Sequence, residues 1–145
     1  MKIWIIILIG VVIIGIIGTV CAYFFVYNKP HPDYEKAEAA YTLPAQELYS
    51  AFITNKTDAE KKFNGQVVSI DGTLKKMEII DSLVIAVFVY NQGVFGDEGI
   101  RCTMLPKFNA SAKTLQPSRI IKIKGLCTGF NDTDVILEKC SILNQ

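Results

Sequence analysis

Residues 3–27 read IWIIILIGVVIIGIIGTVCAYFFVY, a run of 25 residues without a charged side chain. As a helix rising 1.5 Å per residue, the run would be roughly 37 Å long, against about 30 Å for bilayer hydrocarbon. Trp4 lies near one end and an aromatic cluster lies at Tyr23–Tyr27, as interface-anchoring aromatic residues do. The run predicts a single transmembrane helix over residues 1–27, which holds the rest of the chain at the membrane as a soluble domain.

Other interpretations of this run fit less well. A cleaved signal peptide would place Val20 and Ala22 before the cut, but its apolar core would exceed the usual ~7–15 residues. A lipoprotein signal needs a small residue before the cysteine, and Val20 precedes Cys21. A helix buried in the core would be too long for a domain of about 118 residues. We therefore expect an uncleaved anchor.

The orientation of the anchor depends on few charges. Lys2 precedes the run, and Lys29 and Lys36 follow it among acidic residues, so the excess of Lys and Arg on either side is small. A short N-terminal flank with a lysine usually stays cytoplasmic. We expect a single-pass protein whose N-terminus is cytoplasmic and whose C-terminal domain is extracytoplasmic.

The charge of the remaining chain is balanced. Lys2 is the one charge before residue 28, so residues 28–145 carry 14 basic and 14 acidic side chains. Nucleic-acid binding driven by phosphate contacts needs a clear positive excess on one face. The balance disfavours nucleic acid as a partner and favours a protein or a saccharide.

The pattern after the anchor predicts a linker and then helices. Residues 28–41, with His31 between two prolines, indicate a stiff stalk, and residues 42–145 form one domain. Apolar residues at helical spacing predict an amphipathic helix over Leu43–Ile53. Thr57–Glu60 matches a capping box that begins a second, short helix.

From Gln66 onward the apolar residues follow the two-residue period of strands. We expect strands over 66–74, 82–90 and 100–104, a helical link over 106–116, and a last hairpin of 119–130 and 133–143. Five strands with a helical link between the third and fourth predict a mainly β, five-stranded OB-fold barrel preceded by the amphipathic helix. An SH3-like barrel is the alternative, but it would lack the link.

Three segments resemble a known family. They are NKPHPDYEKAEAAYTL at 28–43, KKFNGQVVSIDGTL at 61–74 and IKIKGLCTGFNDTDVILEKCSIL at 121–143. They are similar to the bacterial tRNA_anti-like family, whose members resemble anticodon-binding OB domains and often carry an N-terminal membrane segment. This resemblance implies an OB-fold at a bacterial inner membrane, with the domain in the periplasm. It does not imply an activity, because a fold does not fix function.

Cys127 and Cys140 are the most specific candidate pair. We expect the last hairpin to turn midway between them, so that they would face each other across two strands, within disulfide range. The alternative is two small buried residues, since a one-residue change of register would separate them. A disulfide would require an oxidising compartment, in agreement with an external domain.

The sequence contains no recognisable catalytic or metal-binding set. It has a single histidine, no CxxC spacing and no Gly-x-Ser-x-Gly motif, so we expect no metal, no cofactor and no enzymatic activity.

An OB-fold binds ligands on the face of its second and third strands and on nearby loops. The candidate ligand-binding residues there are aromatic or basic, and they could stack and hold bases or other ligands. They are Lys75, Lys76, Phe88, Tyr90, Arg101 and Phe130. In the other interpretation, Phe88 and Tyr90 pack under the amphipathic helix at the start of the domain, and the lysines are solvated. We expect a membrane-anchored extracytoplasmic binding module, with a nucleic-acid-binding OB domain as the alternative.

Overall fold

The computed structural model describes residues 2–27 and 33–143, apart from the side chain of Tyr27. The chain divides into two compact units between Pro32 and Asp33. The expectations for residues 28–32, including a solvated His31, lie outside the described residues.

The first unit is a helix, α1 (Lys2–Ala22), that continues as a π-helical turn, η1 (Tyr23–Tyr27). The stretch Lys2–Val26 is long and apolar enough to cross a membrane, and none of its side chains is buried. An N-terminal helix of this kind serves either as a membrane anchor or as a signal sequence.

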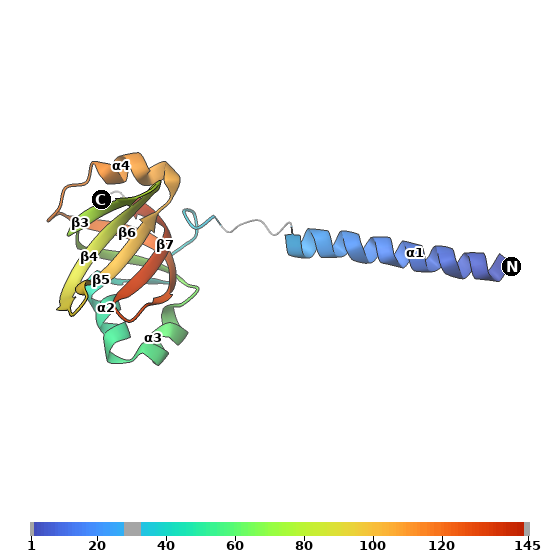
Figure 1. The fold of residues 1–145 in the computed structure, drawn as a ribbon, viewed down its shortest axis with the longest axis horizontal. Coiled ribbons are helices and arrows are strands. Elements are labelled where there is room, and N and C mark those ends of the chain that lie inside the picture. Colours follow the sequence, from blue (N-terminus) through green and yellow to red (C-terminus); the bar gives the residue numbers. More distant parts are fainter. Residues whose placement is uncertain (1, 28–32, 144–145) are drawn as a thin grey trace. The chain divides into compact units, whose positions relative to one another are not determined.

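The second unit is mainly β (Figure 1). Its helices are α2 (Ala45–Thr54), α3 (Lys56–Phe63), a 3-10 turn η2 (Pro106–Phe108) and α4 (Asn109–Lys113). Its strands are β1 (Tyr41–Pro44), β2 (Val67–Thr73), β3 (Lys76–Ile80), β4 (Leu83–Gly93), β5 (Gly96–Met104), β6 (Ile120–Phe130) and β7 (Asp134–Leu143).

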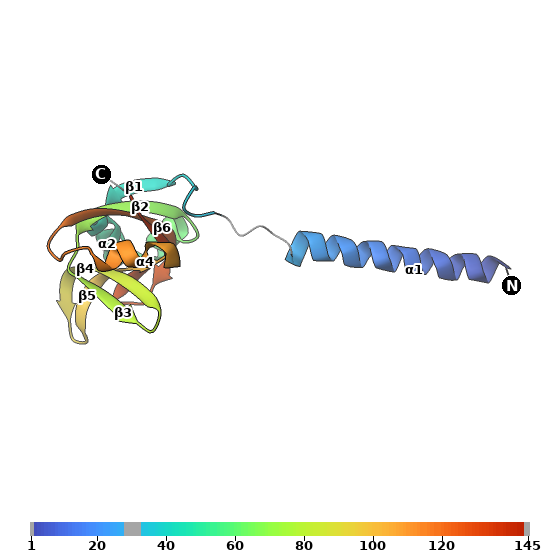
Figure 2. The same cartoon turned by 90° about the horizontal axis from the view of Figure 1, so that it is seen from above.

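The seven strands form one sheet in the order β1-β2-β6-β7-β5-β4-β3. Pairing is parallel between β1 and β2 and between β5 and β7, and antiparallel elsewhere. The sheet curls around the core, with β1 and β2 on one side and β3 to β5 on the other (Figure 2). The mainly β class is confirmed. The predicted five-stranded closed barrel is not confirmed, because the sheet has seven strands and is not closed.

The core lies on the inner face of this curved sheet. Fully buried side chains come from every long strand, among them Ile70, Phe88, Ile100, Ile123 and Leu137. Burying a side chain of this size contributes about 1.5–3 kcal/mol.

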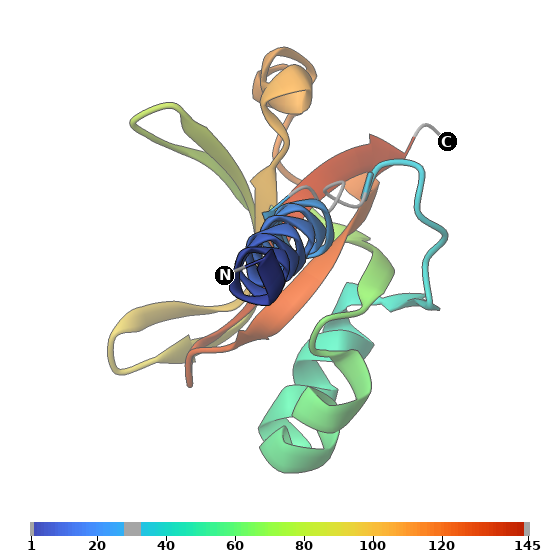
Figure 3. The same ribbon diagram turned by 90° about the vertical axis from the view of Figure 1, so that its right-hand side faces the viewer.

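The helices cover the two ends of the sheet. α2 and α3 lie at one end and α4 at the other (Figures 1 and 3). α2 inserts Leu48 and Phe52 into the core, each at most 1 % exposed, as its amphipathic pattern predicts. Asn55 caps α3 by accepting a hydrogen bond from the Asp58 N–H, so the helix begins one residue before the predicted capping box.

The predicted disulfide between Cys127 and Cys140 is wrong. Two irregularities in the pairing of β6 with β7 shift the register, so Cys127 faces Leu137 instead. Lys139, with φ of 52°, lies in the second irregularity, beyond Leu137, and Cys140 is the register partner of Met104 of β5. Beside the turn, Phe130 pairs with Val135, so the hairpin turns closer to Cys127 than to Cys140 and the two cysteines are not opposed.

The three cysteines of the sheet domain are free, buried thiols. Burial raises the pKa of Cys127 to about 11 and raises the pKa of Cys140 as well. A thiol with a raised pKa stays protonated at neutral pH and reacts slowly with electrophiles.

We therefore expect the native chain to protect Cys102, Cys127 and Cys140 from iodoacetamide. In denaturant without reductant all three should become alkylated, because no disulfide holds them. Mass spectrometry of peptides from the two samples measures this directly. If Cys127 and Cys140 stayed unmodified in denaturant but reacted after reduction, the free-thiol assignment would be wrong.

Candidate binding site

The structure divides the candidate ligand-binding residues between the inside and the outside of the sheet. The three aromatic residues lie inward. Phe88 is fully buried, and the Tyr90 ring stacks on Tyr49 of α2 with centroids 5.9 Å apart. Phe130 packs against Phe52, with centroids 5.7 Å apart. The three rings therefore form no shared, exposed stacking platform.

Burial also sets the protonation state of Tyr90. It raises the pKa of this phenol to about 12, so the hydroxyl stays protonated and neutral at physiological pH. This placement matches the interpretation in which Phe88 and Tyr90 pack under the amphipathic helix of the domain, which is α2.

The basic candidates on the outer face are held by carboxylates. Arg101 of β5 bonds through Nη1 to Glu78 at 2.5 Å and through Nε to Asp134 at 3.0 Å. Lys76 of β3 lies 2.9 Å from Glu78 and 3.8 Å from Asp97. Two cations thus meet three anions, and the network has no positive excess.

Val87 forms the floor of this network. It is the register partner of both Lys76 and Arg101, and it is only 1 % exposed although it lies outside the core cluster. The stems of the long basic side chains can cover such a residue while their charged ends reach the surface. Lys75, next to the network, is exposed.

Glu78 is the electrostatic centre of the network. Hydrogen bonds from Lys76 and, to a smaller extent, Arg101 lower its pKa against the opposing effect of burial. The carboxylate therefore stays ionised to a lower pH in the folded domain than in the unfolded chain.

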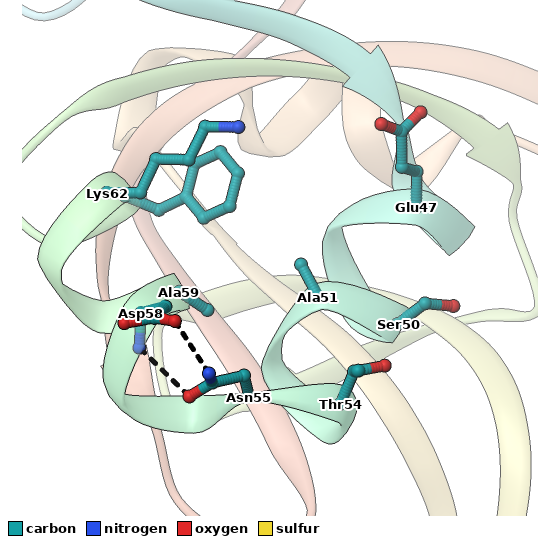
Figure 4. Close-up of a pocket in the computed structure, with 9 residues that line it drawn as sticks. Glu47, Ser50, Ala51, Thr54, Asn55, Asp58, Ala59 and Lys62 are labelled. Carbon is teal, nitrogen blue, oxygen red and sulfur yellow. Dashed lines mark hydrogen bonds between the residues drawn. The ribbon is translucent and has the colours of Figure 1, made fainter.

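A separate groove lies between α2 and α3, with a volume of about 390 Å³. Ala51, Ala59 and Phe63 supply its apolar surface. Glu47 and Lys62 stand on opposite sides of its opening, and Asn55 and Asp58 close one end through mutual hydrogen bonds (Figure 4).

The charge of the groove rim is mainly acidic. The Lys62 ammonium lies over the rings of Tyr41 and Phe63, 5.3 and 4.9 Å from their centroids, so it is already engaged. Glu47 and Asp58 then present carboxylates around an apolar floor. The volume falls in the range of ligand-binding clefts.

The sequence patterns do not indicate this groove. Both helices were predicted, but their mutual angle is set by packing on the core, which no local pattern reports. Ala51 and Ala59 are small residues at facing positions of the two helices, and this pattern could have indicated a groove between them.

Among the described residues, no group of three or more His, Cys, Asp and Glu side chains could hold a metal ion. The lone histidine, His31, lies outside the described residues.

Comparison with known proteins identifies a family and a fold. The tRNA_anti-like family model matches residues 1–142. A provisionally assigned nucleic acid-binding lipoprotein from Klebsiella pneumoniae has a similar fold, with a TM-score of 0.53 and 16% identity over 80% of this chain and 100% of that one. Among curated proteins, none matches the sequence.

Two more distant likenesses are weaker. An OBody bound to hen egg-white lysozyme gives a TM-score of 0.40 at 16% identity, over 58% of this chain and 81% of that one. Aspartyl tRNA synthetase from Entamoeba histolytica gives 0.44 at 11% identity, over 79% of this chain and 24% of that one.

The lowered pKa of Glu78 predicts an acid-dependent stability. Because the pKa is lower in the folded state, Glu78 contributes fully above its unfolded pKa, and the contribution is lost as the pH falls through the folded pKa. Glu78→Gln should be about 1 kcal/mol less stable at pH 7 and should lose less stability on acidification. Urea denaturation of the full chain in detergent, from pH 7 down to pH 3, measures both effects.

Glu47→Gln is the matched control, because Glu47 is exposed and belongs to no ion pair among the described residues. It should reproduce the wild-type dependence on pH. Parallel curves for Glu78→Gln and wild type would contradict the role given to the network.

Proposed function

The chain belongs to the tRNA_anti-like family, and we propose that it is a non-catalytic binding module held at a membrane by its N-terminal helix. Two observations carry this proposal: the outer face around Glu78 has no positive excess, and a separate apolar groove with an acidic rim lies between α2 and α3. Neither surface brings a nucleophile together with a base, which supports binding over catalysis.

We propose that the curved sheet is an OB-fold in which β2 and β3 together form the first strand. Only Leu74 and Lys75 separate them, and they pair with β6 and β4 respectively. β4, β5, β6 and β7 would then be the remaining four strands. The parallel pairing of β5 with β7 and the likeness to the Klebsiella lipoprotein support this assignment.

The proposed topology keeps α1 uncleaved and the sheet domain outside the cytoplasm. The support is the long apolar run and the single lysine before it. Because the cysteines are free, a disulfide no longer supports an oxidising compartment. The lipoprotein name of the Klebsiella structure agrees with an envelope location.

The ligand that fits the groove between α2 and α3 is a protein segment with an apolar side chain beside a lysine or arginine. The apolar side chain would contact Ala51 and Ala59, and the basic group would meet Glu47 and Asp58. The groove offers few hydrogen-bonding groups on its floor, which favours a peptide over a saccharide. Binding of this kind buries an apolar anchor within a polar rim.

Charge reversal at the groove rim tests the partner assignment. Full-length protein, crosslinked in its own membranes and purified, should retain a protein partner, and Glu47→Lys should reduce the recovered partner at least about fivefold because it repels the basic group. Glu138→Lys makes the same charge change on β7 and should leave recovery unchanged. Equal recovery with both variants would exclude the groove as the site.

The alternative function, nucleic-acid binding, predicts a different result. Because Arg101 and Lys76 are neutralised and Tyr90 is stacked inside, we expect dissociation constants of ~10⁻⁴ M or weaker for single strands at physiological salt. Fluorescence anisotropy with labelled oligonucleotides across a salt series measures this. Micromolar binding that Arg101→Gln abolishes would favour the alternative.

A further inference from the structure

Residues 33–40, which we name the strap, lie along the outside of the sheet before β1 (Figure 3). The central contact is made by Lys124 of β6. Its ammonium group donates hydrogen bonds to the main-chain carbonyls of Glu35 and Ala37, at 2.7 and 2.8 Å. A lysine on a strand face is thus used to hold the backbone of a neighbouring segment.

Two further lysines hold the strap by its side chains. Lys107 forms an ion pair with Glu35. The Lys139 ammonium lies 4.6 Å from the centre of the Tyr34 ring. Three cations from three separate segments therefore converge on one short acidic stretch.

The strap is held by polar contacts and contributes nothing to the core. Every residue from 33 to 40 is half-buried or exposed, and none belongs to the core cluster. Ion pairs and cation–π contacts at a surface stabilise weakly. Segments with few buried apolar contacts open at low free-energy cost, so the strap can lift without unfolding the sheet.

The face beneath the strap contains hydroxyl groups without partners. Ser69 of β2 and Ser141 of β7 are both register partners of Lys124, so the three side chains share one row on the outer face. The serines are 3 % and 2 % exposed, and neither Oγ has a hydrogen-bond partner. A buried hydroxyl without a partner is costly, and here two flank an ammonium group.

We propose that this row is a binding site for the phosphate group of an anionic phospholipid, which the strap occupies when the lipid is absent. The phosphate oxygens would accept hydrogen bonds from Ser69, Lys124 and Ser141. Lys107 and Lys139, released from the strap, would add positive charge at the edge. Clusters of lysines near a membrane attract anionic lipid headgroups in this way.

The length of the connection favours a lipid as the source of the phosphate. Six peptide steps separate Tyr27, at the end of the apolar helix, from Asp33, at the start of the strap. Six extended residues span at most about 21 Å. This step rests on the proposed function, because it requires that the helix stay in a bilayer.

The test uses the full chain in maltoside micelles, which contain no phosphate. The probe is glycerophosphoglycerol, the phosphodiester headgroup of phosphatidylglycerol, and binding is followed by amide chemical shifts of residues 122–126 and 139–142. Tyr34→Ala with Glu35→Gln removes the two side-chain contacts of the strap and should strengthen binding about three- to tenfold. Adding Lys124→Gln to that variant should abolish binding, whereas adding Lys61→Gln, on α3, should not.

Each other result overturns the proposal. If releasing the strap does not strengthen binding, or if Lys124→Gln leaves it unchanged, the row is not the site. Equal binding of inorganic phosphate would exclude a lipid headgroup as the specific ligand. Tighter, Lys124-dependent binding of a short single-stranded oligonucleotide would assign the row to nucleic acid. A cleaved or uninserted helix would not change this titration, so its outcome does not depend on whether the proposed anchor is correct.

Discussion

The continuity of the chain through Leu74 and Lys75 is the constraint on which the sheet domain depends. The Leu74 N–H donates to the Arg119 carbonyl at 2.9 Å, and its carbonyl accepts from the Ser118 N–H at 2.7 Å. One residue later, the Lys75 N–H donates to the Val87 carbonyl at 2.9 Å. Two adjacent residues thus bond to opposite ends of the strand order. Because β2 and β3 cannot separate, the sheet must curve, and the inner face becomes narrow enough for α2 and α4 to cover its ends.

Local sequence patterns predicted the elements whose own residues show a clear apolar period. β6 and β7 are found within a residue of the predicted strands, and α2 within two, because alternation and helical spacing mark each of them. β1 and β3 were missed for a different reason. β1 is four residues long and pairs in parallel with β2, and β3 was interpreted as a loop. Their structure comes from partners distant in sequence, which a local window does not contain.

The candidate site shows the same limit. Its residues could be named from the sequence, but their partners could not. Arg101 is neutralised by carboxylates 23 and 33 residues away, on two other strands, so the charge of the face depends on topology. The partner of Cys127 depends on where the last hairpin turns, and the pairing of Phe130 with Val135 places Cys127 opposite Leu137. The balanced overall charge agrees with this network, in which two cations meet three anions.

The strap also determines how the domain responds to mechanical load. A force transmitted from the N-terminal helix reaches the domain at Asp33, and the first contacts in its path are those of Lys139, Lys124 and Lys107. These are a few side-chain bonds loaded one after another, whereas the hydrogen bonds of β2 with β6 share a load along their whole length. The strap would therefore peel away at low force and lengthen the connection by its own eight residues. The strap thus yields before the sheet and protects it from the load.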